Sequence, residues 1–322
     1  MRTLVTGATG LVGNALAKRL CERGHAVRIL VRDPSKAAAI LPKDVDVIAG
    51  DITEAATLPP ALKDVEWVFH AAGMPEQWQK DDSIFDRVNR QGTANVMAAA
   101  LAAGVRRVVY TSTMDVFAAA NGGTLVESNI DTHPKHTAYE RSKQAAEREA
   151  DTVRAQGVEV VFINPCAVYG PSPVQGTLNA LILKLLKGQV PMLPPGGMSV
   201  VYIDGVVDAH LAAAEHGGDG ERYLIGDAFM SMCDIAQETA RLAGWENVPD
   251  EAPLWLLRAI AMVSAPLARV FGFTPLVSPA ELTFLQWQPR VDASKAQREL
   301  GFQPMPVRAG FEKTIEFLRQ RM

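Results

Sequence analysis

Short apolar runs alternate with stretches of helical periodicity through the first half of the chain, and this alternation restricts the fold more than any other feature. Strands that are buried on both faces have continuous apolar sequences, and helices between them require a parallel sheet. Right-handed crossovers then give a doubly wound α/β fold. The expected strands are Thr3–Thr6, Ala26–Val31, Val45–Ala49, Trp67–His70, Val108–Thr111 and Val158–Asn164. The expected helices are Gly10–Arg23, Ser35–Leu41, Ala55–Leu62, Ile84–Ala103 and Ala138–Gln156.

The second half of the chain has a different local composition and a different pattern of expected helices and strands. Proline and glycine are concentrated in residues 171–200, around one expected helix at Thr177–Lys187. Further strands are expected at Ser199–Ile203 and Arg222–Gly226, with a helix at Val207–Glu215 between them and mostly helix after about residue 230. We therefore predict a dinucleotide-binding domain over 1–170, with return segments at about 199–228. Residues 171–198 and 229–322 are expected to form a smaller, interleaved substrate-binding region.

The composition excludes several classes of protein. Of the 322 residues, 48 % are hydrophobic and 21 % are charged, so the chain can bury a core and is not disordered. The net charge of −4 leaves no basic excess for binding nucleic acid. The three cysteines, Cys21, Cys166 and Cys233, lie far apart. This spacing predicts free thiols in a reducing compartment and no metal site.

Two further features bear on location. The N-terminus has no charged segment followed by a long apolar stretch, so no secretory signal is expected. The most apolar later stretch, Leu254–Val277, is interrupted by Arg258, Pro266 and Arg269 and is too broken for a membrane-spanning helix. We therefore expect a cytoplasmic protein without a spanning segment.

A glycine-rich turn follows the first expected strand and opens the first helix. Glycine permits a tight turn there and lets the backbone approach a pyrophosphate, while the helix N-terminus offers free N–H groups to an anion. The alternative is a plain turn between strand and helix. The position of the turn favours dinucleotide binding in a Rossmann fold, and the residues expected at the cofactor are Gly7, Thr9, Gly10, Leu11, Val12 and Gly13.

The end of the second strand indicates which cofactor is preferred. An acidic residue there would bind the ribose 2′-hydroxyl, whereas an arginine can bind a 2′-phosphate. The strand ends at Val31, and Arg32 follows it. A guanidinium donates two parallel hydrogen bonds to a phosphate, so this arrangement favours NADP, with NAD remaining possible. The alternative is that Arg32 is only solvated and that Asp33 caps the next helix.

The ends of the third and fourth strands supply further cofactor candidates. The carboxylate of Asp51 could accept a hydrogen bond from the adenine amino group, and Ile52 could cover the ring. The alternative is that Asp51 or Thr53 caps a helix. After the fourth strand, three small residues would let a cofactor pass close to the edge of the sheet. These residues are Ala71, Ala72 and Gly73.

Tyr139 and Lys143 lie four residues apart on an expected helix, which places both side chains on one face. An ammonium group near a phenol lowers the tyrosine pKa, and a tyrosine tuned in this way can exchange a proton with a carbonyl or an alcohol. Such a pair also arises by chance on solvated helices. Thr111, Ser112 and Thr113 end the fifth strand, where the carboxyl ends of parallel strands face the ligand. Thr113 could orient the substrate oxygen.

The motifs together resemble an extended short-chain dehydrogenase/reductase over nearly the whole chain. They are TGATGLVG at 6–13, GDI at 50–52, HAAG at 70–73, VNRQGTANVM at 88–97, VVYTST at 108–113, YERSK at 139–143, NPCAVYGP at 164–171, VYIDGVVDAH at 201–210, GERYLIG at 220–226 and DASKAQRELGFQP at 292–304.

The resemblance implies roles for several residues. Tyr139 would be the catalytic acid/base, and Lys143 would bind the nicotinamide ribose and tune the tyrosine. Thr113 stands where the family often has serine. Pro165 and Val168, in the NPCAVYGP segment, are expected to line the cofactor. A homodimer through the helices at 84–103 and 138–156 is expected on the same ground.

Within the superfamily, the sequence is most similar to the branch of the dihydroflavonol reductases, 3β-hydroxysteroid dehydrogenases and hopanoid-associated reductases. The leading hypothesis is therefore an NADP-dependent oxidoreductase that acts on a ketone, aldehyde or alcohol of a fairly apolar small molecule. A nucleotide-sugar epimerase or dehydratase with tightly bound NAD is the alternative. It is weakened because residues 171–200 contain only Lys184 and Lys187 as basic residues. A non-catalytic NADP-binding regulator is the third hypothesis.

Overall fold

The computed structural model describes residues 1–174, 176–273, 275 and 277–322, without the side chains of residues 269 and 270. Its main sheet has seven parallel strands in the order β10-β7-β5-β4-β1-β2-β3. The doubly wound fold is thereby confirmed. The strands are β1 Arg2–Thr6, β2 Ala26–Val31, β3 Asp46–Ala49, β4 Trp67–His70, β5 Arg107–Thr111, β7 Glu159–Pro165 and β10 Arg222–Ile225.

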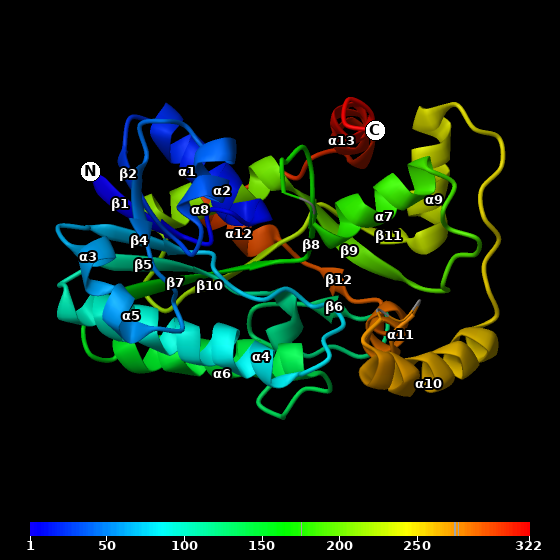
Figure 1. Ribbon diagram of the computed structural model, residues 1–322, viewed down its shortest axis with the longest axis horizontal. Coiled ribbons are helices and arrows are strands. Elements are labelled where there is room, and N and C mark those ends of the chain that lie inside the picture. Colours follow the sequence, from blue (N-terminus) through cyan, green and yellow to red (C-terminus); the bar gives the residue numbers. More distant parts are fainter. Residues whose placement is uncertain (175, 274, 276) are drawn as a thin grey trace.

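Helices cover both faces of this sheet (Figure 1), because successive side chains of each strand point to opposite sides. Val5 and Phe69 belong to a core shared with α1 (Leu11–Glu22) and α8 (Ile203–His216). Leu4 and Val68 belong to a second core, on the face covered by α5 and α6. The remaining helices beside the sheet are α2 Pro34–Ile40, η1 Ala55–Thr57, α3 Pro59–Leu62, α5 Gly92–Ala102, α6 Ala138–Arg154 and α12 Ser294–Leu300.

A second, three-stranded sheet lies beyond the carboxyl edge of the first. It consists of β8 (Ala167–Tyr169), β9 (Gly197–Tyr202) and β11 (Ala228–Ser231), in the order β11-β9-β8. The strand expected at Ser199–Ile203 therefore forms, but it pairs in this small sheet and not in the main one. The segment at 199–228 is divided between the two sheets, and the division of the chain into two domains stays a prediction.

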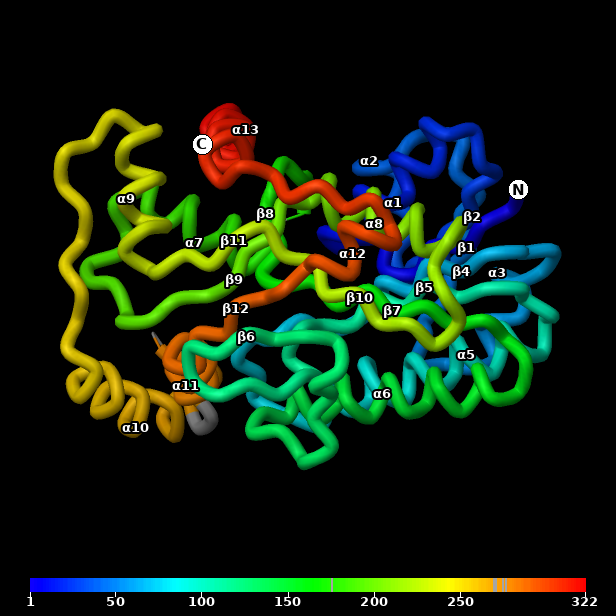
Figure 2. The backbone as a smooth tube through the Cα atoms, turned by 180° about the vertical axis from the view of Figure 1, so that it is seen from behind, coloured from blue at the N-terminus to red at the C-terminus, as the bar shows by residue number. Residues whose placement is uncertain are grey.

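The last third of the chain is mostly helical, as expected. Seen from behind (Figure 2), α10 and α11 lie at the end of the molecule away from the N-terminus, joined to the main sheet region through the short pair β6–β12. Among the described residues, no helix has both the length and the apolar character needed to cross a membrane. The helices and short strands outside the two larger sheets and the helices that cover the main one are β6 Thr124–Leu125, α7 Thr177–Leu186, α9 Met232–Ala243, α10 Leu254–Phe271, α11 Pro279–Trp287, β12 Arg290–Val291 and α13 Val307–Arg319.

One long helix of the prediction is interrupted. The stretch expected as Ile84–Ala103 is built from α4 (Ser83–Phe85), the π-helical turn η2 (Asp86–Gln91) and α5. A π turn adds a residue to the helical repeat and often occurs at functional sites. Here it contains Asn89, which is almost completely buried.

Candidate active site

The glycine turn adopts the form that a pyrophosphate site needs. Gly7 has a φ of +75°, and a Cβ there would lie 2.6 Å from the carbonyl carbon of Ala71. A Cβ on Gly13 would lie 2.3 Å from the oxygen of Gly7. Helix α1 begins at Leu11, and its N-cap residue, Gly10, offers no side-chain cap, so the first N–H groups are left for a ligand. This cradle fits the pyrophosphate of a dinucleotide.

Thr9, Leu11 and Val12 are half-buried around the same turn. A Cβ on Gly176 would lie 2.7 Å from Cδ2 of Leu11, so the loop before α7 passes directly over the turn. This loop is the stretch rich in proline and glycine. Its position covers one side of the predicted cofactor path.

Arg32 lies just beyond β2 and is exposed, and within the described part of the chain its guanidinium has no hydrogen-bond or ion-pair partner. Asp33 caps α2, because its Oδ1 accepts hydrogen bonds from the backbone nitrogens of Ser35 at 2.9 Å and Lys36 at 3.2 Å. Capping by Asp33 is thus observed, and it leaves Arg32 available for a ligand.

Asp51 follows β3, and its Oδ1 accepts hydrogen bonds from the backbone nitrogen and Oγ1 of Thr53, each at 2.9 Å. This is a local turn and not a helix cap, because the next helix, η1, has Glu54 at its N-cap without a side-chain hydrogen bond. The turn occupies one oxygen of the Asp51 carboxylate. Ile52 is buried below the start of α5, where a Cβ on Gly92 would lie 2.7 Å from its Cδ1. Whether either residue contacts adenine stays a prediction.

The carboxyl ends of β4, β5 and β7 are neighbours and bring the next candidates together. Ala71, Ala72 and Gly73 follow β4, Pro165 ends β7, and Val168 lies in β8. Ser112 is buried, and among the described residues its Oγ has no hydrogen-bond partner. An orphaned hydroxyl at this edge is suited to a ligand, because a buried polar group without a partner is costly. Thr111 is engaged differently, since its Oγ1 bonds to Nε2 of His210 at 2.7 Å.

Lys143 is buried below this edge. Its Nζ donates to the hydroxyl of Tyr110 at 2.8 Å and to the carbonyl oxygen of Thr111 at 2.9 Å. Burial lowers the pKa of Lys143 to about 8, although the nearby carboxylates of Glu147 and Asp115 oppose this shift. The ammonium group is thus held by β5 in a fixed position.

The prediction that an ammonium group lowers the Tyr139 pKa is wrong for this structure. Burial raises the pKa of Tyr139 well above its usual value, and the carboxyl groups of Asp115 and Glu76 raise it further. The physical reason is that the Lys143 ammonium is bonded to Tyr110 and Thr111, while two acidic groups flank the phenol. A hydrogen bond between Tyr139 and Thr113 acts in the opposite direction.

Sequence reasoning missed the two acidic groups. Asp115 follows Thr113 in the short helix η3 (Met114–Val116), and Glu76 lies in the segment after β4. Burial raises the pKa of both carboxyl groups. The charge of Asp115 raises the pKa of Glu76 further, and the charge of Glu140 raises that of Asp115. One oxygen of each, Oδ1 of Asp115 and Oε1 of Glu76, is buried without a protein partner. Their proximity depends on tertiary contacts, so no spacing in the sequence signals it.

Asn89 lies in the motif at 88–97, and three hydrogen bonds hold its side chain. Its Oδ1 accepts a hydrogen bond from the backbone nitrogen of Met74 at 2.7 Å, and its Nδ2 donates to the carbonyl oxygen of Met74 at 3.1 Å. Nδ2 also donates to Oγ of Ser142 at 2.9 Å. The π turn therefore ties the segment leading to Glu76 to the helix that carries Tyr139.

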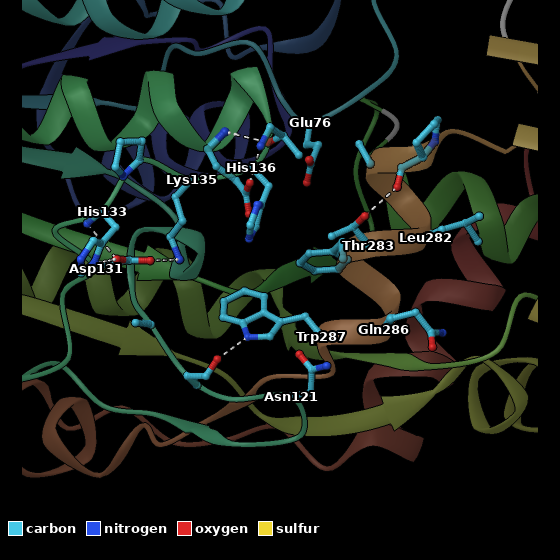
Figure 3. A pocket seen from close by; sticks show the side chains of 18 of the residues that line it. Glu76, Asn121, Asp131, His133, Lys135, His136, Leu282, Thr283, Gln286 and Trp287 are labelled. Carbon is cyan, nitrogen blue, oxygen red and sulfur yellow. Dashed lines mark hydrogen bonds and ion pairs between the residues drawn. The ribbon is translucent and has the colours of Figure 1, made fainter. Parts of the chain in front are cut away.

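A cavity of about 860 Å³ opens beside these groups. Figure 3 shows Glu76 and His136 on one side of it and Trp287 on another, with Leu282 and Thr283 from α11. Thr137 and Glu140, close to Tyr139 in α6, also line it, as do Ala261 and Met262 of α10. Helix α10 thus contributes Arg258, Ala261 and Met262 to the wall of the cavity.

A parallel sheet with this strand order and a glycine turn after its first strand defines a dinucleotide-binding enzyme. The profile of the NAD dependent epimerase/dehydratase family matches residues 3–226. The chain belongs to this family and is an NAD(P)-dependent enzyme of the extended short-chain dehydrogenase/reductase type, which confirms the resemblance seen in the sequence.

Named relatives support the same branch. The chain is 33 % identical over 326 residues to sterol demethylase protein B of Methylococcus capsulatus, covering 100 % of this chain and 99 % of that protein. It is 30 % identical over 322 residues to a putative dihydroflavonol 4-reductase of Synechocystis, covering 98 % of this chain and 94 % of that protein.

Solved structures show the same architecture. The crystal structure of gox2253 is similar with a TM-score of 0.81 at 32 % identity, covering 99 % of this chain and 98 % of that one. The structure of MoeE5 in complex with UDP-glucose and NAD is similar with a TM-score of 0.79 at 25 % identity, covering 100 % of this chain and 99 % of that one.

Proposed function

We propose that the protein is an NADP-dependent oxidoreductase that reduces a ketone or aldehyde of a fairly hydrophobic small molecule, or oxidises the corresponding alcohol. One observation carries the proposal: Lys143 donates to the carbonyl oxygen of Thr111 at 2.9 Å, and Tyr139 lies within reach of Thr113 at the same end of β5. A cavity lined by Thr137 and Glu140, which are close to Tyr139 in the sequence, opens beside them, and α10 and α11 form its far wall. That wall includes Ala261, Met262 and Leu282. Apolar walls with a few convergent polar groups are typical of sites for small molecules.

The cofactor would lie along the carboxyl edge of the sheet. The turn at 7–13 would bind its pyrophosphate, Arg32 its 2′-phosphate, and Lys143 the hydroxyls of the nicotinamide ribose. Ser112 has a free hydroxyl at the same edge. The unpaired guanidinium of Arg32 supports NADP over NAD.

The chain's own residues then handle the proton. When bound, the reduced nicotinamide supplies a hydride to the carbonyl carbon. Tyr139 donates its phenolic proton to the carbonyl oxygen, and Thr113 orients that oxygen. A positioned acid of this kind contributes about 10²- to 10⁴-fold to the rate.

The test follows the absorbance of reduced nicotinamide with NADPH and NADH side by side. The panel of substrates should include steroid ketones, dihydroflavonols, aryl aldehydes and β-keto esters. Turnover with NADPH on an apolar carbonyl compound is the expected result. No turnover with either cofactor across the panel would contradict the proposal.

Nucleotide-sugar chemistry is the second candidate, because MoeE5 holds UDP-glucose and NAD on the same fold. It predicts NAD that remains bound through purification and basic groups that grip a diphosphate. In the described part of 171–200, the only basic residues are Lys184 on α7 and Lys187 at the C-terminal cap of that helix. Release of NAD on denaturing the purified protein would favour this candidate.

The homodimer through 84–103 and 138–156 also stays a prediction, to be checked by light scattering.

A further inference from the structure

The hydroxyl of Thr113 is already committed within the protein. A threonine hydroxyl has one proton to donate and two lone pairs to accept with. Its proton is donated to Oδ2 of Asp115 at 2.6 Å, and one lone pair accepts the backbone N–H of Asp115 at 3.3 Å. As long as Asp115 accepts that proton, Thr113 has none to give to a substrate oxygen.

Asp115 is poorly supported as a carboxylate. It is only 5 % exposed, and its Oδ1 has no hydrogen-bond partner in the part of the chain that the structure describes. An ionised carboxylate can accept about four hydrogen bonds. The neighbouring cations are engaged elsewhere: Lys143 donates to Tyr110 and Thr111, and Lys135 donates to the carbonyl oxygen of Phe117 and pairs with Asp131. Buried charges usually require several partners.

The charged groups that face Asp115 come from three elements. Helix α6 contributes Glu140 and Lys143, the segment before it contributes Lys135, and the segment after β4 contributes Glu76. Glu140 and Glu76 are acidic and oppose ionisation of Asp115, whereas the two lysines favour it. The phenol of Tyr139 also lies within range of this carboxyl group.

We propose that Asp115 is a positioning residue that sets the direction of the Thr113 hydroxyl, and that carbonyl reduction requires Asp115 to be protonated. A protonated Asp115 donates its own proton to Oγ1 of Thr113. The Thr113 proton is then free to point at the carbonyl oxygen of the substrate. An ionised Asp115 removes this donor and places a negative charge near the oxygen on which charge develops.

The proton count is simple. The hydride adds to the carbonyl carbon, the C=O π pair moves to the oxygen, and that oxygen takes the proton of Tyr139, which regains one from solvent. Thr113 contributes a hydrogen bond and Asp115 keeps its proton. Losing one donor to a developing oxyanion costs about 10²- to 10³-fold in rate. This inference rests on the proposed carbonyl reduction.

The experiment measures kcat and KM for a ketone with NADPH between about pH 5 and about pH 9, a range that spans the raised carboxyl pKa. The proteins are wild type, Asp115→Asn, Thr113→Val and the exposed control Asp44→Asn. In wild type, kcat/KM should fall by about tenfold per pH unit above the pKa of Asp115, as expected for loss of one protonated form. The fall should level off at about 10²-fold.

Asp115→Asn removes the charge, and its amide can still donate a hydrogen bond to Thr113. Its kcat/KM should therefore stay at the low-pH value of wild type across the range. At high pH, the difference from wild type should lie in kcat rather than in KM. Thr113→Val should be slow at every pH and should lack the fall. Asp44→Asn should match wild type. If Asp115→Asn or Thr113→Val keeps the wild-type pH dependence, the proposal is wrong.

A measurement without turnover separates this inference from the proposed function. Infrared difference spectra of the NADP-bound protein should show a protonated carboxyl band in wild type that is missing in Asp115→Asn and shifted in Thr113→Val. The band should disappear as the pH rises. If no ketone is reduced although this band is present, only the proposed carbonyl reduction is wrong. Absence of the band at all pH values would overturn the role of Asp115.

Discussion

The Nζ of Lys143 donates a hydrogen bond to the hydroxyl of Tyr110 at 2.8 Å. Tyr110 is fully buried in β5, and its ring stacks on His70 with centroids 5.3 Å apart. Burial lowers the pKa of His70 to about 3, so this histidine is neutral and its nitrogens bond to Thr6 and Thr93. The ammonium group of Lys143 therefore rests on a rigid, uncharged support beneath the cofactor path.

Tyr110→Phe should loosen Lys143 without changing the core. Loss of this acceptor should destabilise the fold by about 1–3 kcal/mol and weaken cofactor binding by about tenfold. Chemical unfolding and cofactor titration check the two effects. Tyr223→Phe is the matched control, because its buried hydroxyl bonds to Glu299 away from the site. Unchanged cofactor affinity in Tyr110→Phe would argue against this support.

Arg32→Ala should change the cofactor preference. A hydrogen-bonded pair with a phosphate contributes about 1.5–3 kcal/mol, so the dissociation constant of NADPH should rise by about 10- to 100-fold while that of NADH stays constant. Titration of both cofactors by fluorescence measures this. Arg23→Ala, an exposed arginine paired with Glu215, should change neither. An unchanged ratio of the two constants would remove the basis for NADP preference.

Gly7→Ala should separate backbone strain from steric exclusion in the glycine turn. Gly24 has nearly the same conformation, with a φ of +78° against +75°, but a Cβ there meets nothing within 4 Å. Gly24→Ala should therefore lose about 1–2 kcal/mol of unfolding free energy from strain alone. Gly7→Ala should lose about 1–3 kcal/mol more from the clash with Ala71. Equal losses in denaturant unfolding would show that the close approach is not rigid.

Glu76→Gln should stabilise the protein at neutral and alkaline pH. The pKa of Glu76 is raised in the folded state, so the folded protein binds more protons than the unfolded chain above the ordinary carboxyl pKa. Wild type should therefore lose stability as the pH rises from about 4 to about 8, by about 1 kcal/mol or more. Glu76→Gln should lose less stability than wild type over this range, with the remaining loss due to other raised carboxyl groups such as Asp115, and the exposed Glu54→Gln should show the full wild-type loss. Parallel unfolding curves at several pH values decide between these outcomes.

Much of the architecture could be predicted from local patterns. The strands of the main sheet are continuous apolar runs, and burial on both faces is the physical cause of that pattern. The short strands β6, β8, β11 and β12 were missed because two to four residues carry no periodic signal. The π turn around Asn89 was missed because its residues fit an ordinary helix.

The site was predictable only in part. Helical spacing placed Tyr139 and Lys143 on one face, but the lysine side chain extends to Tyr110 on β5, which the spacing does not indicate. The effect of Glu76 and Asp115 on the Tyr139 pKa arises from burial and long-range contact. Such electrostatic relationships depend on the tertiary structure, so the sign of that pKa shift could not be obtained from the sequence.

The most direct test of the central claim compares wild type and Tyr139→Phe in a single turnover with NADPH and a ketone that wild type reduces. Tyr139→Phe removes only the phenolic hydroxyl group and keeps the ring against Phe85, where the centroids are 6.0 Å apart. We predict that the rate of nicotinamide oxidation falls by about 10²-fold or more, with the NADPH dissociation constant unchanged. A single-turnover rate equal to that of wild type would contradict the proposed role of Tyr139 and the reaction built on it.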